Sequence, residues 1–242
     1  MITSLHSAES NLGQVVAPVE PQRKRLTTPQ RWLSLAELAL GSAIVIGHNV
    51  YHLISNEVPI LFVLGLFSLR MRGGSWAVTG LRWPSSWRRT VLLALAAAAL
   101  RILLGALVVR PLTAHFLPPA TAPSGSDEIQ GHALAALEWL LLVWTFAAFG
   151  EEIGYRGYLL TRAAEAGGLS RLAWWGAIFV SAVLFGYGHY YKGPSGMVDS
   201  GIAGLILAVT FVLSKRNLWV CIVAHGFIDT FAVVTAFFGW QT

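Results

Sequence analysis

Charged residues are scarce in this sequence. Only 12% of its 242 residues are Asp, Glu, Lys or Arg, about half the share of an average soluble domain. The single cysteine, Cys221, excludes internal disulfides and a cysteine metal cage. The polar segment 1–21 has no apolar core, so no cleavable signal peptide is expected. The low share of charged residues, together with an apolar share of 55%, excludes a soluble globular enzyme, a disordered chain and a nucleic-acid-binding module.

Apolar residues are abundant instead. They make up 55% of the chain, and the mean hydropathy is +0.60. They gather in seven stretches, most of them near the roughly 20 residues that a membrane-spanning helix needs. We therefore predict an all-α fold, a polytopic bundle of about seven transmembrane helices in a lipid bilayer. The seven stretches are residues 32–54, 58–69, 90–109, 133–150, 172–188, 197–214 and 218–240.

The positive charges predict the orientation of this bundle. If all seven stretches cross, nearly all Lys and Arg residues between them fall on the side of the N-terminus, and only Arg110 and Lys192 fall on the other. Cytoplasmic loops carry such an excess, so we expect a cytoplasmic N-terminus and a multi-pass protein of a cell membrane, bacterial by its short chain and its preference for Arg over Lys. Residues 1–31 are expected to form a disordered cytoplasmic tail, and residues 32–242 a single membrane-embedded domain. The outer loop 110–131 is expected to lack internal structure.

Ionisable residues inside apolar stretches are costly and indicate function. The richest group is Glu151, Glu152 and Arg156, which directly follows an apolar run. On a helix Glu152 and Arg156 are separated by four residues and are expected to form an ion pair. Glu151 points about 100° away, so one carboxylate is clamped while the other is free for proton transfer.

Two histidines follow in later apolar stretches. His189 ends the sequence FGYGH, and His225 lies four residues before Asp229 in HGFID, on one helical face. A turn at 167–168 is expected to pair two stretches as an antiparallel hairpin, which places Glu151 and His189 at similar depths. By the same residue count His225 is expected to lie somewhat shallower.

The remaining ionisable residues predict less chemistry. Glu37, one turn into the first stretch, is expected to reach the cytoplasmic surface. Arg101 and Glu138 lie deeper and are expected to pair with each other. Lys192 and Asp199 flank a short outer loop at 193–196 and are expected to be solvated.

The segments EEIGYRGYLL, FGYGH and HGFID resemble the motifs EExxxR, FxxxH and Hxxx[N/D] of the CAAX protease and bacteriocin-processing family, over residues 76–240. The resemblance implies an intramembrane endopeptidase of the glutamate type, which hydrolyses a peptide bond of a membrane-associated protein or peptide without a cofactor or metal. Glu151 would be the general base, assisted by His189. His225 and Asp229 would stabilise the oxyanion. Glu152 and Arg156 would form the supporting pair.

The third motif ends in Asp229, where the prenyl endopeptidases of that family usually have Asn. An ionised carboxylate cannot donate a hydrogen bond to an oxyanion. Asp229 is therefore either a protonated donor or an ionised group that orients His225.

Two alternative functions stay open at this point. One is a non-proteolytic bacteriocin-immunity or membrane scaffold protein of the same family. The other is a zinc-dependent intramembrane protease that uses His189, His225 and a carboxylate, which are residue types that bind zinc. The sequence contains no compact HExxH motif, so the zinc alternative depends on ligands that are far apart in the chain.

Overall fold

The computed structural model describes residues 26–118 and 126–240, and all regular structure within these ranges is helical. The expected all-α fold is confirmed there. The principal helices are α1 (Thr28–Asn49), α2 (Glu57–Met71), α3 (Trp87–Leu104), α6 (Ala133–Leu142), α7 (Thr161–Ala166), α8 (Arg171–Tyr187), α9 (Gly193–Leu213) and α10 (Leu218–Phe237). The shorter segments are η1 (Trp76–Thr79), η2 (Gly105–Val109), α4 (Arg110–Phe116), α5 (Ser126–Ile129), η3 (Val143–Leu160) and η4 (Tyr190–Lys192).

Several helix starts follow from capping residues in the sequence. The side chain of Asn56 accepts a hydrogen bond from the backbone N–H of Val58, and Asn217 does the same for Trp219. α1 begins at Thr28, so the last four residues of the expected N-terminal tail are helical. Residues 1–25 of that tail lie outside the described residues.

Within the described residues, four continuous helical runs are long and apolar enough to cross a membrane. They are Trp87–Phe116, Ala133–Ala166, Tyr190–Leu213 and Leu218–Phe237. Large apolar side chains stand exposed on these runs, among them Leu107, Leu141 and Leu213. Such faces suit the hydrocarbon of a bilayer, and the architecture is that of a multi-pass membrane protein. The shorter α8 is also apolar, and the total of seven crossings stays a prediction.

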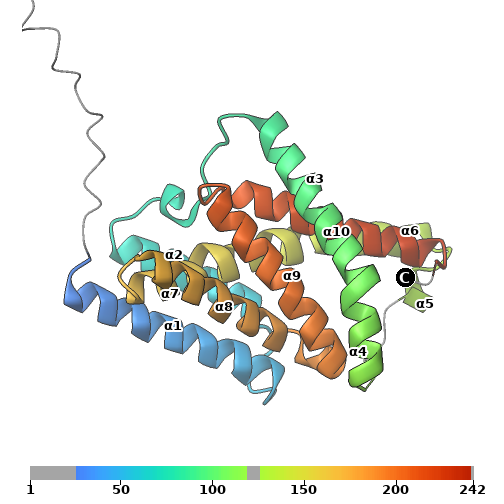
Figure 1. The fold of residues 1–242 in the computed structure, drawn as a ribbon, viewed down its shortest axis with the longest axis horizontal. Coiled ribbons are helices and arrows are strands. Elements are labelled where there is room, and N and C mark those ends of the chain that lie inside the picture. Colours follow the sequence, from blue (N-terminus) through green and yellow to red (C-terminus); the bar gives the residue numbers. More distant parts are fainter. Residues whose placement is uncertain (1–25, 119–125, 241–242) are drawn as a thin grey trace, which may run out of the picture.

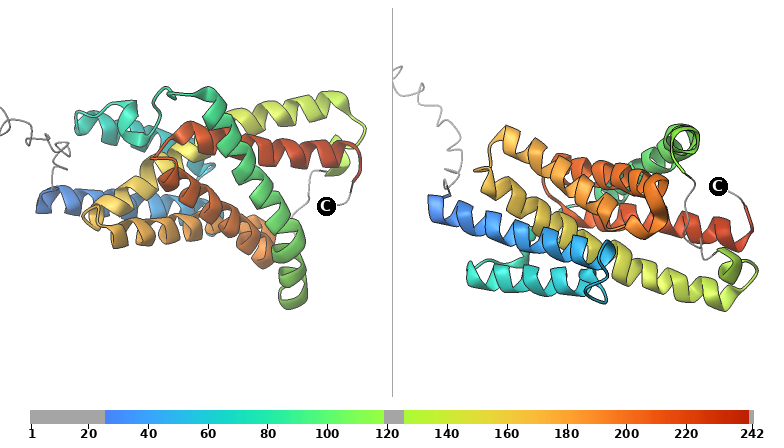
Figure 2. Two further views of the ribbon diagram at one scale, coloured as in Figure 1. Left: turned by 45° about the horizontal axis from the view of Figure 1, so that its top comes forward. Right: turned by 90° about the horizontal axis from the view of Figure 1, so that it is seen from below.

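The helices form two groups that meet around η3 (Figures 1 and 2). α1 packs against α2, α7 and α8 in the first group, and α10 runs beside α6 in the second. α3 crosses α10, and α9 lies along α8. η3 contacts α2, α8 and α10, so the segment that carries the first motif touches helices of both groups.

Two expected loops contain helix. The segment 110–131 includes α4 and α5, so the prediction that it lacks internal structure is wrong. The second is the segment 193–196, which forms the first turn of α9. Pro194 is compatible with that position because the first turn of a helix needs no N–H donor there.

The salt-bridge partner of Arg101 differs from the one expected. Arg101 on α3 pairs with Asp199 on α9, with 2.5 Å between Nη2 and Oδ2. Glu138 is exposed on α6. α9, and not α6, brings an acid to Arg101, so the predicted Arg101–Glu138 pair and the solvated Asp199 are both wrong. Lys192 is half-buried, with its Nζ 5.7 Å from the centre of the Tyr191 ring.

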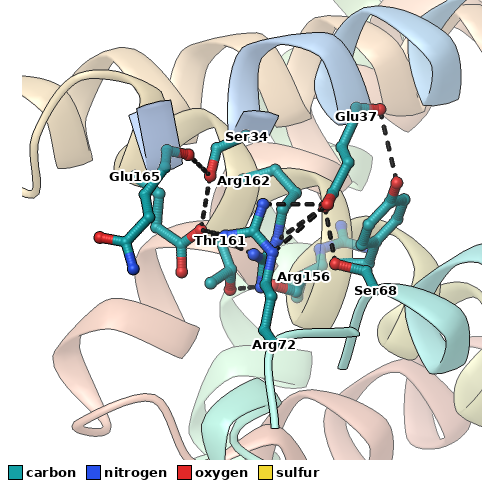
Figure 3. Close-up of polar contacts among 10 residues, drawn as sticks. Ser34, Glu37, Ser68, Arg72, Arg156, Thr161, Arg162 and Glu165 are labelled. Atoms are coloured by element: carbon teal, nitrogen blue, oxygen red, sulfur yellow. Dashed lines mark hydrogen bonds and ion pairs between the residues drawn. The ribbon is translucent and has the colours of Figure 1, made fainter. Parts of the chain in front are cut away.

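α1, α2 and α7 are fastened together by Glu37, Arg72, Arg162 and Glu165, which we call the α1–α2–α7 ion cluster (Figure 3). Arg72 reaches between the two acids, 2.9 Å from Glu37 Oε1 and 3.1 Å from Glu165 Oε2. Arg162 lies 2.7 Å from Glu165 Oε2 and 3.6 Å from Glu37 Oε2. Glu37 is therefore paired inside the bundle, and the expectation that it reaches the surface is wrong.

Candidate active site

The first motif lies on η3, which is π-helical from Val143 to Leu160 and not α-helical as the spacing argument assumed. In a π-helix each N–H bonds the carbonyl five residues earlier, and short π segments are frequent at functional sites. Four residues still make nearly one turn, so Glu152 and Arg156 remain on one face.

Glycines on η3 allow α2 to approach the motif closely. A Cβ atom at Gly150 would lie 2.8 Å from Val58 Cγ1, and one at Gly154 would lie 3.2 Å from Leu61 Cβ. Both distances are shorter than side chains normally tolerate. The start of α2 is therefore held beside the turn of η3 that carries Glu151.

Glu152 is the centre of a fully buried ion group. Its Oε1 accepts a hydrogen bond from Arg156 Nη1 at 2.8 Å, and both side chains are 0% exposed. The predicted ion pair is confirmed. The same oxygen lies 2.8 Å from His225 Nδ1, and a carboxylate only accepts, so Nδ1–H is the donor. This contact puts His225 at the level of the first motif, deeper than the residue count suggested.

Phe185, the first residue of the second motif, contacts ionisable residues of all three motifs. The guanidinium carbon of Arg156 lies 4.3 Å from the centre of its ring, which is a cation–π contact. The ring centres of His189 and His225 lie 4.9 and 6.0 Å away. Arg156 also reaches the carbonyl oxygen of Gly204 on α9 at 3.3 Å. The three motifs therefore converge on one place in the bundle.

The hydrogen bond of His189 determines which of its ring nitrogens can accept a proton. Its Nδ1 lies 2.9 Å from the carbonyl oxygen of Phe185. A carbonyl only accepts, so Nδ1 carries the hydrogen, and Nε2 of the neutral ring keeps a lone pair. That nitrogen can accept a proton from a water molecule.

His225 faces a carboxylate on each side. Beyond the contact to Glu152, its Nε2 lies 3.4 Å from Asp229 Oδ2, and the Asp229 side chain is 30% exposed. The predicted sharing of one helical face is confirmed. If Asp229 is protonated it can donate to Nε2, and if it is ionised the imidazolium can donate to it.

Glu151 differs from Glu152 in that no hydrogen bond or ion pair joins its carboxylate to another described residue, although each acid has a buried Oε2 without a hydrogen-bond partner. Oε2 of Glu151 is buried and has no hydrogen-bond partner, although buried polar atoms are nearly always paired. The carboxylate interacts electrostatically with His225, Asp229 and Arg156. Among the described residues no direct hydrogen bond joins Glu151 to His189, so cooperation between them needs a bridging water.

Across residues 26–118 and 126–240, no group of three or more His, Cys, Asp or Glu side chains is arranged to hold a metal ion. The ionisable residues of the three motifs instead contact one another, backbone carbonyls and an aromatic ring. The fold and the site together define a class of protein, namely a polytopic helical membrane protein with carboxylate and imidazole groups buried among its helices.

Residues 133–231 match the family described as type II CAAX prenyl endopeptidase, Rce1-like. This segment includes all three motifs, so the resemblance that they indicate is confirmed over these residues. No curated protein and no solved structure matches the chain.

Proposed function

We propose that this protein is an intramembrane endopeptidase of the glutamate type, which hydrolyses a peptide bond of a membrane-associated protein or peptide. The observation that carries the proposal is the asymmetry of the adjacent acids. Arg156 and His225 both contact Oε1 of Glu152, whereas the Glu151 carboxylate has no hydrogen-bond or ion-pair partner among the described residues. The protease family that matches residues 133–231 supports the same reaction.

In the proposed mechanism Glu151 and His189 activate a water molecule. One proton of the water passes to the Glu151 carboxylate, and the His189 Nε2 lone pair accepts a hydrogen bond from the other. The water oxygen then attacks the peptide carbonyl, whose π-electron pair moves to the oxygen. When this tetrahedral intermediate collapses, the C–N bond breaks and the proton held by Glu151 passes to the leaving amine.

The developing oxyanion needs hydrogen-bond donors. His225 Nε2–H and a protonated Asp229 are the two available groups on α10. Glu152 and Arg156 do not contact the reacting atoms in this scheme. They hold the His225 ring through Nδ1, so its second nitrogen keeps a fixed direction.

The orientation of the chain is part of the proposal. With seven crossings and a cytoplasmic N-terminus, the C-terminus and residues 121–130 lie outside the cell membrane. Reporter fusions at both places are expected to report the outer side. A cytoplasmic signal from the C-terminus would show that the stretch at residues 58–69 does not cross.

The direct test is a peptidase assay of the purified full-length protein in detergent or nanodiscs. A peptide library is incubated with the parent, Glu151→Ala and Glu138→Ala, and the products are identified by mass spectrometry. Glu138 is an exposed acid on α6 and serves as the matched control. We expect defined cleavages with the parent and the control, and none with Glu151→Ala. Equal cleavage by Glu151→Ala would refute the proposed base, and an inactive parent would favour the immunity or scaffold alternative.

A further inference from the structure

A tyrosine outside the proposed chemistry lies directly behind the site. Tyr155 is on η3 and only 1% exposed. Its ring packs edge-on against Phe185, with the ring centres 5.0 Å apart. Its hydroxyl lies against Gly188, where any Cβ atom would overlap the phenol oxygen. Tyr155 therefore touches both the residue that accepts the His189 hydrogen bond and the residue that precedes His189.

Tyr155 is itself held by a second acid–imidazole pair. Its hydroxyl donates to Glu57 Oε1 over 3.4 Å. Glu57 begins α2 and is 6% exposed, and its Oε2 lies 3.2 Å from His48 Nε2. His48 Nδ1 in turn lies 2.7 Å from the carbonyl oxygen of Ile54. This chain of contacts leads from the α1–α2 connection to the back of the candidate site.

Burying the polar side chains of Glu57 and Tyr155 is costly, which indicates that they have a function. A carboxylate taken out of water is expensive even when it is paired. Glu57 is buried, and its partners are a phenol and a histidine that is itself partly exposed. Neither Glu57 nor Tyr155 contacts the reacting atoms in the proposed mechanism. Their contacts lead to residues 185–188, the turn that carries His189.

We propose that Tyr155 is a positioning residue for His189, held in place by the Glu57–His48 pair. With its ring against Phe185 and its hydroxyl against Gly188, Tyr155 fixes the turn in which His189 Nδ1–H bonds the Phe185 carbonyl. That bond sets the direction of the Nε2 lone pair. If residues 185–188 are displaced, the lone pair no longer points at the water molecule that attacks the peptide bond in the proposed mechanism. The catalytic part of this inference rests on the proposed function.

The overlap between a residue-188 side chain and the Tyr155 hydroxyl allows a suppressor test. Gly188→Ala is expected to lower kcat at least twentyfold, because the new methyl group meets the phenol oxygen. Tyr155→Phe removes that oxygen, and the next ring atom is 3.4 Å from the new Cβ, an ordinary contact. Tyr155→Phe alone is expected to lower kcat five- to tenfold with KM unchanged, and the double variant to recover to that level.

Gly186→Ala is the matched control, because it lies on the same helix but its Cβ would meet the backbone oxygen of Met197 at 2.9 Å. Tyr155→Phe is expected to give it no recovery. The inference is overturned if the Gly188→Ala double variant stays as inactive as Gly188→Ala, or if Tyr155→Phe rescues both glycine variants equally.

A readout without substrate separates this inference from the proposed function. In protein labelled with ¹⁵N-histidine, the His189 signals, assigned by their loss in His189→Gln, report which nitrogen carries the hydrogen. We expect the Nδ1–H form in the parent, its loss in Gly188→Ala, and its return in the double variant. A His189 spectrum that Gly188→Ala leaves unchanged would contradict the positioning role, even if the parent proved to be no peptidase.

Discussion

Two groups of buried charges lie in this molecule, and they are paired to different degrees. In the α1–α2–α7 ion cluster two carboxylates face two guanidinium groups, and serine hydroxyls donate to both acids (Figure 3). In the candidate site Glu151, Glu152 and Asp229 share one arginine and two histidines, and the buried Oε2 atoms of Glu151 and Glu152 have no hydrogen-bond partner. The first group is nearly complete without a ligand, and the second is not.

This difference separates a structural group from a reactive one. A buried charge that lacks a partner costs several kcal/mol, so it persists only where something else requires it. Perturbed, incompletely paired ionisable groups gather at functional sites. The α1–α2–α7 ion cluster has no vacant acceptor on its acids comparable to Glu151 Oε2, and we expect it to contribute stability alone.

The largest effect is expected from Glu152→Gln. The substitution removes the charge that both Arg156 Nη1 and His225 Nδ1 contact. Leaving a buried arginine unpaired costs about 3–5 kcal/mol, and the freed His225 ring loses its direction. We expect a marked fall in melting temperature together with loss of peptidase activity. Glu138→Gln is the exposed control, and an unchanged melting temperature in Glu152→Gln would contradict the account.

Glu165→Gln is expected to lower the stability of the protein without changing its peptidase activity. Glu165 Oε2 receives contacts from Arg72, Arg162 and Ser34. Its loss is expected to cost about 3 kcal/mol of unfolding free energy, since two arginines lose a partner. The kcat/KM of the protein that remains folded should equal that of the parent. A selective loss of kcat in Glu165→Gln would show that this cluster communicates with the site.

The contacts that the sequence predicted are those within one helical turn. Glu152–Arg156 and His225–Asp229 are each four residues apart, and both pairs are close in the structure. The contact between Glu152 and His225 spans 73 residues, and no local periodicity specifies which helices meet. The same reason explains Arg101, which pairs with Asp199 because α9 packs against α3. The π-helical winding of η3 also escaped prediction, because its residues have no pattern that separates it from an α-helix.

A smaller effect is expected from Asp229→Asn. In the proposed mechanism His225 donates its Nδ1–H to Glu152 and its Nε2–H to the oxyanion, and an amide at position 229 can take the place of a protonated Asp229 as the second donor. We expect kcat within about threefold of the parent in a steady-state assay. A hundredfold loss with unchanged substrate binding, about 2.7 kcal/mol of transition-state stabilisation, would instead show that an ionised Asp229 orients His225.

The smallest effect is expected from metal removal. Turnover in the proposed mechanism uses only Glu151, His189 and the donors of α10. Prolonged dialysis against a strong chelator should leave kcat unchanged, with metal content followed by elemental analysis. One tightly bound zinc per chain, whose removal stops turnover and whose return restores it, would make the zinc-dependent alternative the better one.

The most direct test of the comparison is Glu151→Gln, measured for peptide hydrolysis and for melting temperature in one preparation. The amide keeps the shape of the side chain but cannot accept the proton, and the oxygen it replaces has no hydrogen-bond partner to lose. We predict less than a few per cent of the parent kcat with a melting temperature at or slightly above that of the parent. Substantial remaining activity, or a loss of stability as large as that of Glu152→Gln, would contradict the assignment of Glu151 as the free, reactive acid.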